Sequence, residues 1–140
     1  MPDLCTYDYA IVRVVPHVHR GEFVNAGVIV ACASKGFLKA RIALDEARLR
    51  ALDPAADVAS LLAALAAIPA TCTGGAAAGP IGRLSLRERF DWLVAPRSTS
   101  IQMSPVHAGR AADLDDALQR LMDRMVSPPQ PAPPQAASPR

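Results

Sequence analysis

The run Tyr7-Asp8-Tyr9-Ala10-Ile11-Val12-Arg13-Val14-Val15 decides the fold of this chain. It is rich in β-branched and aromatic residues, which favour strands. Successive side chains of a strand point to opposite faces, and here both alternating sets are mostly apolar. The pattern therefore predicts a central strand that is buried on both faces.

Two more strands are expected after this run. The segment from Pro16 to Gly21 interrupts the apolar pattern, which resumes from Glu22 to Cys32, so the two runs predict a β-hairpin. From Leu38 to Leu44 apolar residues alternate with more polar ones, which predicts a third strand with one wet face. Such a meander needs a layer of helices on its apolar side to form a core.

The first helix is expected soon after the third strand. Asp53 followed by Pro54 is typical of a helix start, because the carboxylate caps free amides and proline fits the first helical position. Apolar residues then repeat at helical spacing from Val58 to Ile68, and Pro69 is expected to end the helix. The glycine-rich segment from Thr71 to Gly82 predicts a flexible connection.

The remaining elements follow from local signals. Ser85 and Glu88 match a capping box, which predicts a helix from Leu86 to Val94. The segment from Ser98 to Met103 favours a short fourth strand. An apolar stripe at helical spacing predicts a last helix from Asp113 to Val126.

These elements predict an α+β fold in a single domain, residues 1–126. We expect an antiparallel sheet of three to four strands packed on one face by two or three helices. Residues 127–140 are proline-rich without apolar periodicity, which predicts a disordered tail. The tail is either inert or, through its P-x-x-P spacing, a docking segment.

Composition narrows the class of protein. A chain of 140 residues with 51% hydrophobic content suits one domain. Its net charge of +2 is spread along the chain, which disfavours strong nucleic-acid binding. Three cysteines without a Cys-x-x-Cys pair favour the reducing cytoplasm and predict no thiolate zinc site. We expect no secretory signal and no membrane span.

One cluster of anion-capable side chains stands out. Arg97, Ser98 and Thr99 lie at a predicted helix-to-strand junction, with Arg87 and Arg89 upstream, so they can converge on a phosphate or carboxylate. The alternative is that the hydroxyls bond their own backbone and that Arg97 pairs with a carboxylate such as Glu22 or Asp91.

The histidines carry weaker signals. His107 lies between proline and glycine and is a candidate proton carrier or catalytic residue, although a structural hydrogen bond is the alternative. His17 and His19 have the minimum spacing for a metal pair, and a third ligand would come from Glu22, Asp8 or His107. Two histidines at a hairpin tip are more often solvated surface, and we expect neither a metal nor a cofactor.

Asn25 and Gly27 are unusual within the second strand because both lower strand propensity. A bulge or a close backbone contact is one explanation. The other is a concave surface opened by Gly27, on which Arg13 and Asn25 present polar groups.

Three blocks of the chain, in order, carry a family resemblance: Tyr7 to Pro16, Glu22 to Ile29, and Ala95 to Gly109. On these blocks the chain resembles the bacterial domain-of-unknown-function family 3037. The resemblance marks a set of motif positions, of which we interpret Glu22, Gly27, Phe90 and Gly109 as structural and Arg13, Asn25, Arg97 and His107 as binding residues. It also implies a gene neighbourhood that includes a HipA-like kinase.

Two functions are therefore expected. The first is a non-enzymatic bacterial accessory domain that binds a protein partner, such as a HipA-like kinase, near Arg97 and His107. The alternative is a protein that binds or processes a phosphorylated or nucleotide-like small molecule, with Arg13 and Arg97 holding the anion and His107 carrying a proton. Nucleic-acid binding would need several arginines on one face and is disfavoured.

Overall fold

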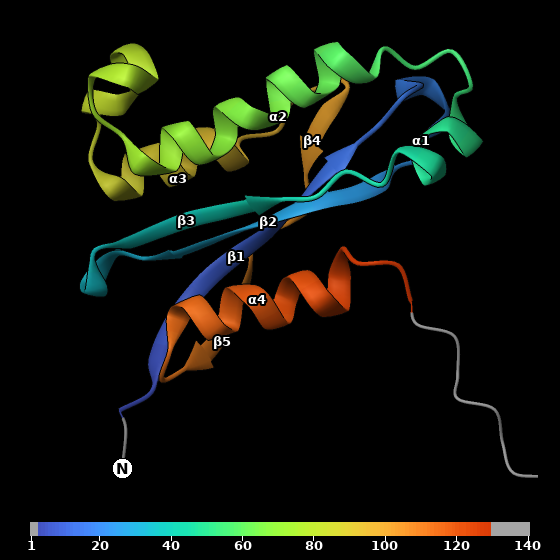
Figure 1. Ribbon diagram of the computed structural model, residues 1–140. Coiled ribbons are helices and arrows are strands. Elements are labelled where there is room, and N and C mark those ends of the chain that lie inside the picture. The colour runs from blue at the N-terminus through green and yellow to red at the C-terminus, as the bar shows by residue number, and fades with distance from the viewer. Residues whose placement is uncertain (1–2, 130–140) are drawn as a thin grey trace, which may run out of the picture.

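The computed structural model describes residues 3–129, and its centre is an antiparallel sheet (Figure 1). Strand β1, Cys5–Val14, lies in the middle, as the sequence predicts. Strand β2, Val24–Cys32, pairs with one side of β1, and β3, Phe37–Ile42, pairs with β2. The predicted hairpin and third strand are confirmed.

The other side of β1 carries two short strands in place of the one predicted. β4, Ile101–Met103, and β5, His107–Ala111, pair with opposite ends of β1, so the described residues form a five-stranded sheet. Between them Ser104 keeps contact with β1, because its backbone N–H donates to Ile11 O over 2.9 Å and its hydroxyl accepts from Ile11 N over 2.8 Å. The serine hydroxyl thus bridges the interruption at Pro105, which has no N–H to donate.

Helices cover both faces of the sheet, which corrects the prediction of a single covered face (Figure 1). On one face lie α1, Glu46–Leu52, α2, Val58–Thr73, and α3, Leu86–Val94. On the other lies α4, Leu114–Met125. The reason is in the strands themselves: β1 and β2 are apolar on both faces, so each face needs a cover. The α+β class and the antiparallel sheet are confirmed.

The two faces hold separate cores. On the first, Val12 and Val14 of β1 pack with Leu65 of α2 and Phe90 of α3. On the second, Tyr7 of β1 and residues of β2 pack against the apolar stripe of α4. This stripe consists of Leu114, Ala117, Leu118, Leu121 and Met122. The wet face expected for β3 lies beside the polar flank of α4, where Lys39 Nζ and Asp115 Oδ1 are 2.8 Å apart.

The first helical region differs from the prediction. Helix α1 was not expected, and Asp53 ends it in place of starting the next helix. Helix α2 begins after Asp57, whose carboxylate accepts a hydrogen bond from Ser60 N. Pro69 does not end α2, which continues to Thr73. Proline removes one helical hydrogen bond, but the C-terminal part of α2 is buried and still packs on the sheet through Ile68 and Cys72.

The connection that follows α2 is folded rather than irregular. Residues Ala76–Arg83 form a 3-10 segment with a break at Gly79. Gly75 N donates to Gly82 O over 3.0 Å, and the two glycines approach so closely that a Cβ at Gly82 would lie 2.0 Å from Gly75 O. The glycines therefore close a compact turn in place of the flexible link that composition predicts.

Two helix boundaries match the prediction closely. Helix α3 begins after Ser85, and the reciprocal hydrogen bonds of the predicted capping box with Glu88 are both present. Helix α4 begins after Asp113, whose carboxylate accepts from Asp116 N over 3.1 Å. The predicted disordered tail, residues 127–140, lies outside the described residues from position 130 onward.

Candidate functional site

Arg97, the centre of the predicted anion cluster, is tied to the end of α3. Its Nη1 donates to Leu93 O over 3.0 Å and its Nη2 to Trp92 O over 2.6 Å. The guanidinium carbon also lies 4.6 Å from the centroid of the Trp92 ring. A cation at a helix C-terminus satisfies carbonyls that have no helical partner. The structure thus gives Arg97 a capping role, and neither Glu22 nor Asp91 is its partner in residues 3–129.

The hydroxyls beside Arg97 organise the loop that enters β4. Thr99 Oγ1 donates to Ile101 O over 2.7 Å, and Gln102 Nε2 donates to Thr99 O over 3.0 Å. Ser98 is exposed. Local bonds of this kind are common for threonine and serine in turns. The side chains of Thr99 and Gln102 are therefore directed at the backbone of the loop itself.

The upstream arginines are also engaged elsewhere. Arg87 Nη1 lies 2.7 Å from Asp8 Oδ2 and its Nε 3.1 Å from Asp91 Oδ1. Arg89 donates to Thr71 O over 3.0 Å and caps the end of α2 much as Arg97 caps α3. The structure does not bring these guanidinium groups together around one anion.

His107, the candidate proton carrier, lies on β5 opposite Tyr9 of β1. The two ring centroids are 5.4 Å apart, and His107 is exposed. Within residues 3–129 its side chain makes no hydrogen bond to another protein group. General acid–base chemistry needs a positioned partner, and the described part of the chain supplies none to this imidazole.

Arg13 and Asn25 are neighbours across β1 and β2, next to a bulge. Asn25 Nδ2 donates to Met125 O over 2.9 Å and so fixes the end of α4. The Arg13 guanidinium lies 4.2 Å from the centroid of the Phe23 ring. Arg13 Nε and Asn25 Oδ1 are buried and have no hydrogen-bond partner within residues 3–129. The cavity beside Arg97 is not lined by Arg13 or His107, so the predicted three-residue anion pocket is not assembled.

Four residues are interpreted from the sequence as structural, and the structure shows what surrounds each of them. Gly27 lies at the bulge of β2, where a Cβ would be 2.5 Å from Arg41 O. Gly109 faces Tyr7, and a Cβ there would be 2.5 Å from the Tyr7 ring. Phe90 is fully buried in the first core. Glu22 is exposed and pairs with its neighbour Arg20.

A cavity lies beside the end of α3, and we call this cavity, together with the Trp92 ring that contacts its lining residue Arg97, the Trp92 surface. Its members are Trp92, Arg97 and Val106, together with the cavity of about 290 Å³ between α3 and the β4–β5 edge. Trp92 is 43% exposed and Val106 is 43% exposed. The cavity is lined by Val94, Pro96, Arg97, Gln102, Met103, Ser104, Pro105 and Val106.

Sequence reasoning missed Trp92, although a signal was present. The buried face of α3 is marked by Phe90 and Leu93, and helical periodicity places Trp92 off that face. It is also the single tryptophan of the chain. A large aromatic side chain off the buried stripe of a short helix is therefore the feature that would have marked this surface.

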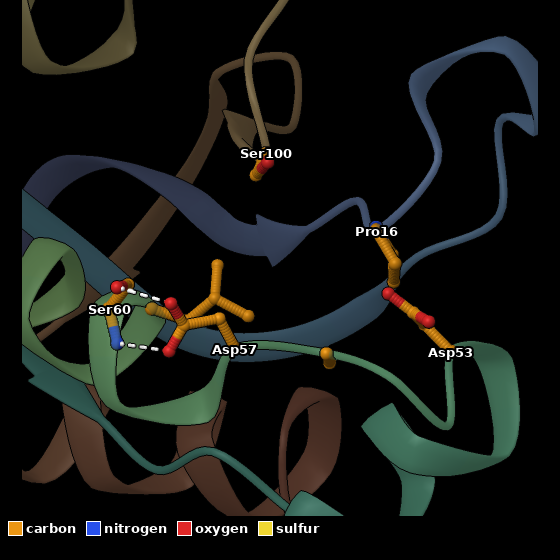
Figure 2. Close-up of a pocket in the computed structure, with 7 residues that line it drawn as sticks. Pro16, Asp53, Asp57, Ser60 and Ser100 are labelled. Atoms are coloured by element: carbon orange, nitrogen blue, oxygen red, sulfur yellow. Dashed lines mark hydrogen bonds between the residues drawn. The ribbon is translucent and has the colours of Figure 1, made fainter.

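A second cavity, of about 220 Å³, lies where α2 begins (Figure 2). Figure 2 shows Asp57 joined to Ser60 by two hydrogen bonds, which lower the pKa of the Asp57 carboxyl. Asp53, on the other side, accepts from Ala55 N over 3.1 Å and lies 3.7 Å from His17 Nε2. Both carboxylates hold local backbone in place, so this cavity offers no free acid–base pair.

The metal pair considered as an alternative for His17 and His19 gains no third ligand among residues 3–129. His17 and His19 have ring centroids 5.9 Å apart, but residues 3–129 contain no group of three or more histidine, cysteine, aspartate or glutamate side chains placed to hold a metal ion.

Cys72 provides a test of the packing between α2 and the sheet. Burial raises the pKa of its thiol to about 12, against an opposing effect of the Arg89 charge. We expect a disulfide reagent at pH 8 to modify the half-buried Cys5 first, and Cys72 only after unfolding. Rapid labelling of Cys72 in the native protein, mapped by mass spectrometry, would contradict the packing.

The raised pKa of the Cys72 thiol also predicts how the stability of the fold changes with pH. The folded state favours the neutral thiol, because its pKa lies above the ordinary value of 9.0. The resulting contribution to stability is complete below pH 9 and is lost as the pH rises toward 12.

No single helix within residues 3–129 is long and apolar enough to cross a membrane; α2 and the segment Ala76–Arg83 reach that length and composition only together, across a 64° bend.

These features define a small α+β domain, in which helices cover both faces of the sheet and the Trp92 surface lies at the end of α3. The model of a protein family of unknown function, DUF3037, matches residues 9–126, and the chain belongs to that family. The resemblance expected from the sequence is thus confirmed. No curated protein and no solved structure matches the chain.

Proposed function

We propose that this chain is an accessory domain that binds a protein partner through the Trp92 surface. The observation that carries the proposal is the half-exposed Trp92 ring, which lies against the guanidinium of Arg97, a residue that lines the cavity and is fixed by two hydrogen bonds. Tryptophan and arginine dominate the binding energy of protein interfaces, especially beside pockets.

The way Arg97 is held supports this function further. Binding costs conformational entropy when long side chains become ordered, and Arg97 is already ordered by Leu93 O and Trp92 O. Val106 and Pro105 add apolar area on the other rim of the cavity. The surface therefore combines apolar anchors with a polar rim, the usual anatomy of an interface.

The partner we propose is a HipA-like kinase, which the family resemblance implies, and the compartment is the bacterial cytoplasm. The three cysteines, none of which is in a disulfide, support a reducing environment. In this proposal the domain serves the kinase as a binding subunit and performs no chemistry of its own.

The test is the affinity of the purified domain for a HipA-like kinase from the same host, measured by calorimetry. We expect Trp92→Ala to weaken binding at least tenfold. Leu62→Ala is the matched control, because Leu62 on α2 is 42% exposed and lies away from the cavity. Leu62→Ala should bind like the wild type. Absence of binding by the wild type, or unchanged binding by Trp92→Ala, would overturn the proposal.

A further inference from the structure

A third cavity, of about 230 Å³, lies between β5 and α4, on the face of the sheet that α4 covers. Three of its lining residues are arginines: Arg110 from β5 and Arg120 and Arg124 from α4. The other lining residues are Tyr7, Ala117 and Leu121, so no carboxylate lines it. We call this cavity the arginine pocket.

Glycine shapes the floor of the arginine pocket. Tyr7 pairs with Gly109 across β1 and β5, and a Cβ at Gly109 would lie 2.5 Å from the Tyr7 Cζ and Oη atoms. The tyrosine ring therefore lies against the bare backbone of β5. Ala117 and Leu121 are buried and continue the apolar floor onto α4.

The charges of the pocket are only partly neutralised. Arg120 Nε lies 3.1 Å from Asp116 Oδ2, in a pair whose side chains are both more than half exposed. Within residues 3–129 neither Arg110 nor Arg124 makes an ion pair. Exposed pairs of this kind contribute little to stability.

A structural role explains only part of this arrangement. Arg124 lies in the last turn of α4, where a cation stabilises the helix dipole. That reason does not apply to Arg110, which pairs with Thr6 on the edge strand β5 and lines the pocket from the edge of the sheet. Arginine is the residue that best matches phosphate oxygens, because its planar group donates two parallel hydrogen bonds.

We infer that the arginine pocket binds a phosphomonoester dianion. The pocket is smaller than the roughly 300–1,000 Å³ of pockets for drug-sized ligands, so it suits a phosphate group or a short phosphomonoester rather than a whole nucleotide. This site differs from the anion cluster expected at Arg97, and it is independent of the Trp92 surface.

The test is calorimetric titration of the full chain with inorganic phosphate at pH 8, at an ionic strength held constant with chloride. We expect saturable binding that Arg110→Gln and Arg124→Gln each weaken about tenfold. The control is Arg50→Gln, because Arg50 occupies the last turn of α1 as Arg124 does that of α4. The control should bind phosphate like the wild type.

Two further titrations identify the source of the phosphomonoester, one with glycerol 3-phosphate and one with a phosphoserine peptide. Binding of either one that depends on Arg110 and Arg124 supports the inference. It is overturned if the wild type binds no phosphate, or if the double variant Arg110→Gln, Arg124→Gln binds as tightly while its melting temperature stays unchanged.

Discussion

Replacing Phe90 with alanine should lower the free energy of unfolding by about 4 kcal/mol. Phe90 is fully buried between α3 and the sheet, where it packs in the first core. The substitution removes apolar contact and leaves a cavity that the surrounding β-branched side chains cannot fill without strain. Equilibrium unfolding in urea, followed by circular dichroism, measures the loss.

Trp92→Ala is the matched control on the same helix, because Trp92 is 43% exposed. Its loss of stability should stay below about 1 kcal/mol, as expected for a surface substitution. The contrast distinguishes Phe90, which stabilises the fold, from Trp92, which is available to bind a partner. Equal losses for both variants would contradict this division.

Gly27→Ala should cost about 3 kcal/mol, although it adds a single methyl group. The new Cβ would lie 2.5 Å from Arg41 O and 2.7 Å from Ile42 Cδ1, so β3 would have to move away from β2. Both strands are tied to the cores on either side of the sheet, which limits that movement. The same unfolding experiment measures the effect.

Gly36→Ala serves as the control for backbone freedom alone. Gly36 has a φ of +62°, but nothing lies within 4 Å of a Cβ placed there. Its replacement should therefore cost only about 1 kcal/mol, the strain of a left-handed conformation. If Gly27→Ala cost no more than Gly36→Ala, crowding at the bulge would not be the reason for glycine at position 27.

The sequence predicts those parts of the fold that depend on local signals. The alternation from Tyr7 to Val15 places β1 at the centre, and the capping box at Ser85 gives the start of α3. The stripe of α4 is equally clear. Each of these signals lies within one element, so no knowledge of distant contacts is needed.

The missed elements depend on contacts between distant segments. Pro105 separates β5 from β4, and the two strands lie on one edge because each pairs with β1, with Ser104 bonded to Ile11 between them. Helix α1 has seven residues and a single buried one, Leu49, so it offers almost no periodicity to detect. Asp53 and Asp57 both suit a helix cap, and local sequence alone does not choose between them.

The candidate sites show the same division. The sequence marks Arg97 as unusual, but its hydrogen bonds to the carbonyls of α3 depend on how the chain turns after Pro96. The arginine pocket combines Tyr7 with residues more than 100 positions later. Side chains so far apart are brought together only by the pairing of β5 with β1.

The most direct test of the proposed function is photo-crosslinking in the native host. A photoreactive phenylalanine derivative would replace Trp92 in the full chain, and Leu62 in a matched experiment. Proteins joined to each position would be identified by mass spectrometry. We predict an adduct with the HipA-like kinase from position 92 and none from position 62. Equal adducts from both positions, or no kinase adduct from position 92, would contradict the assignment of the Trp92 surface.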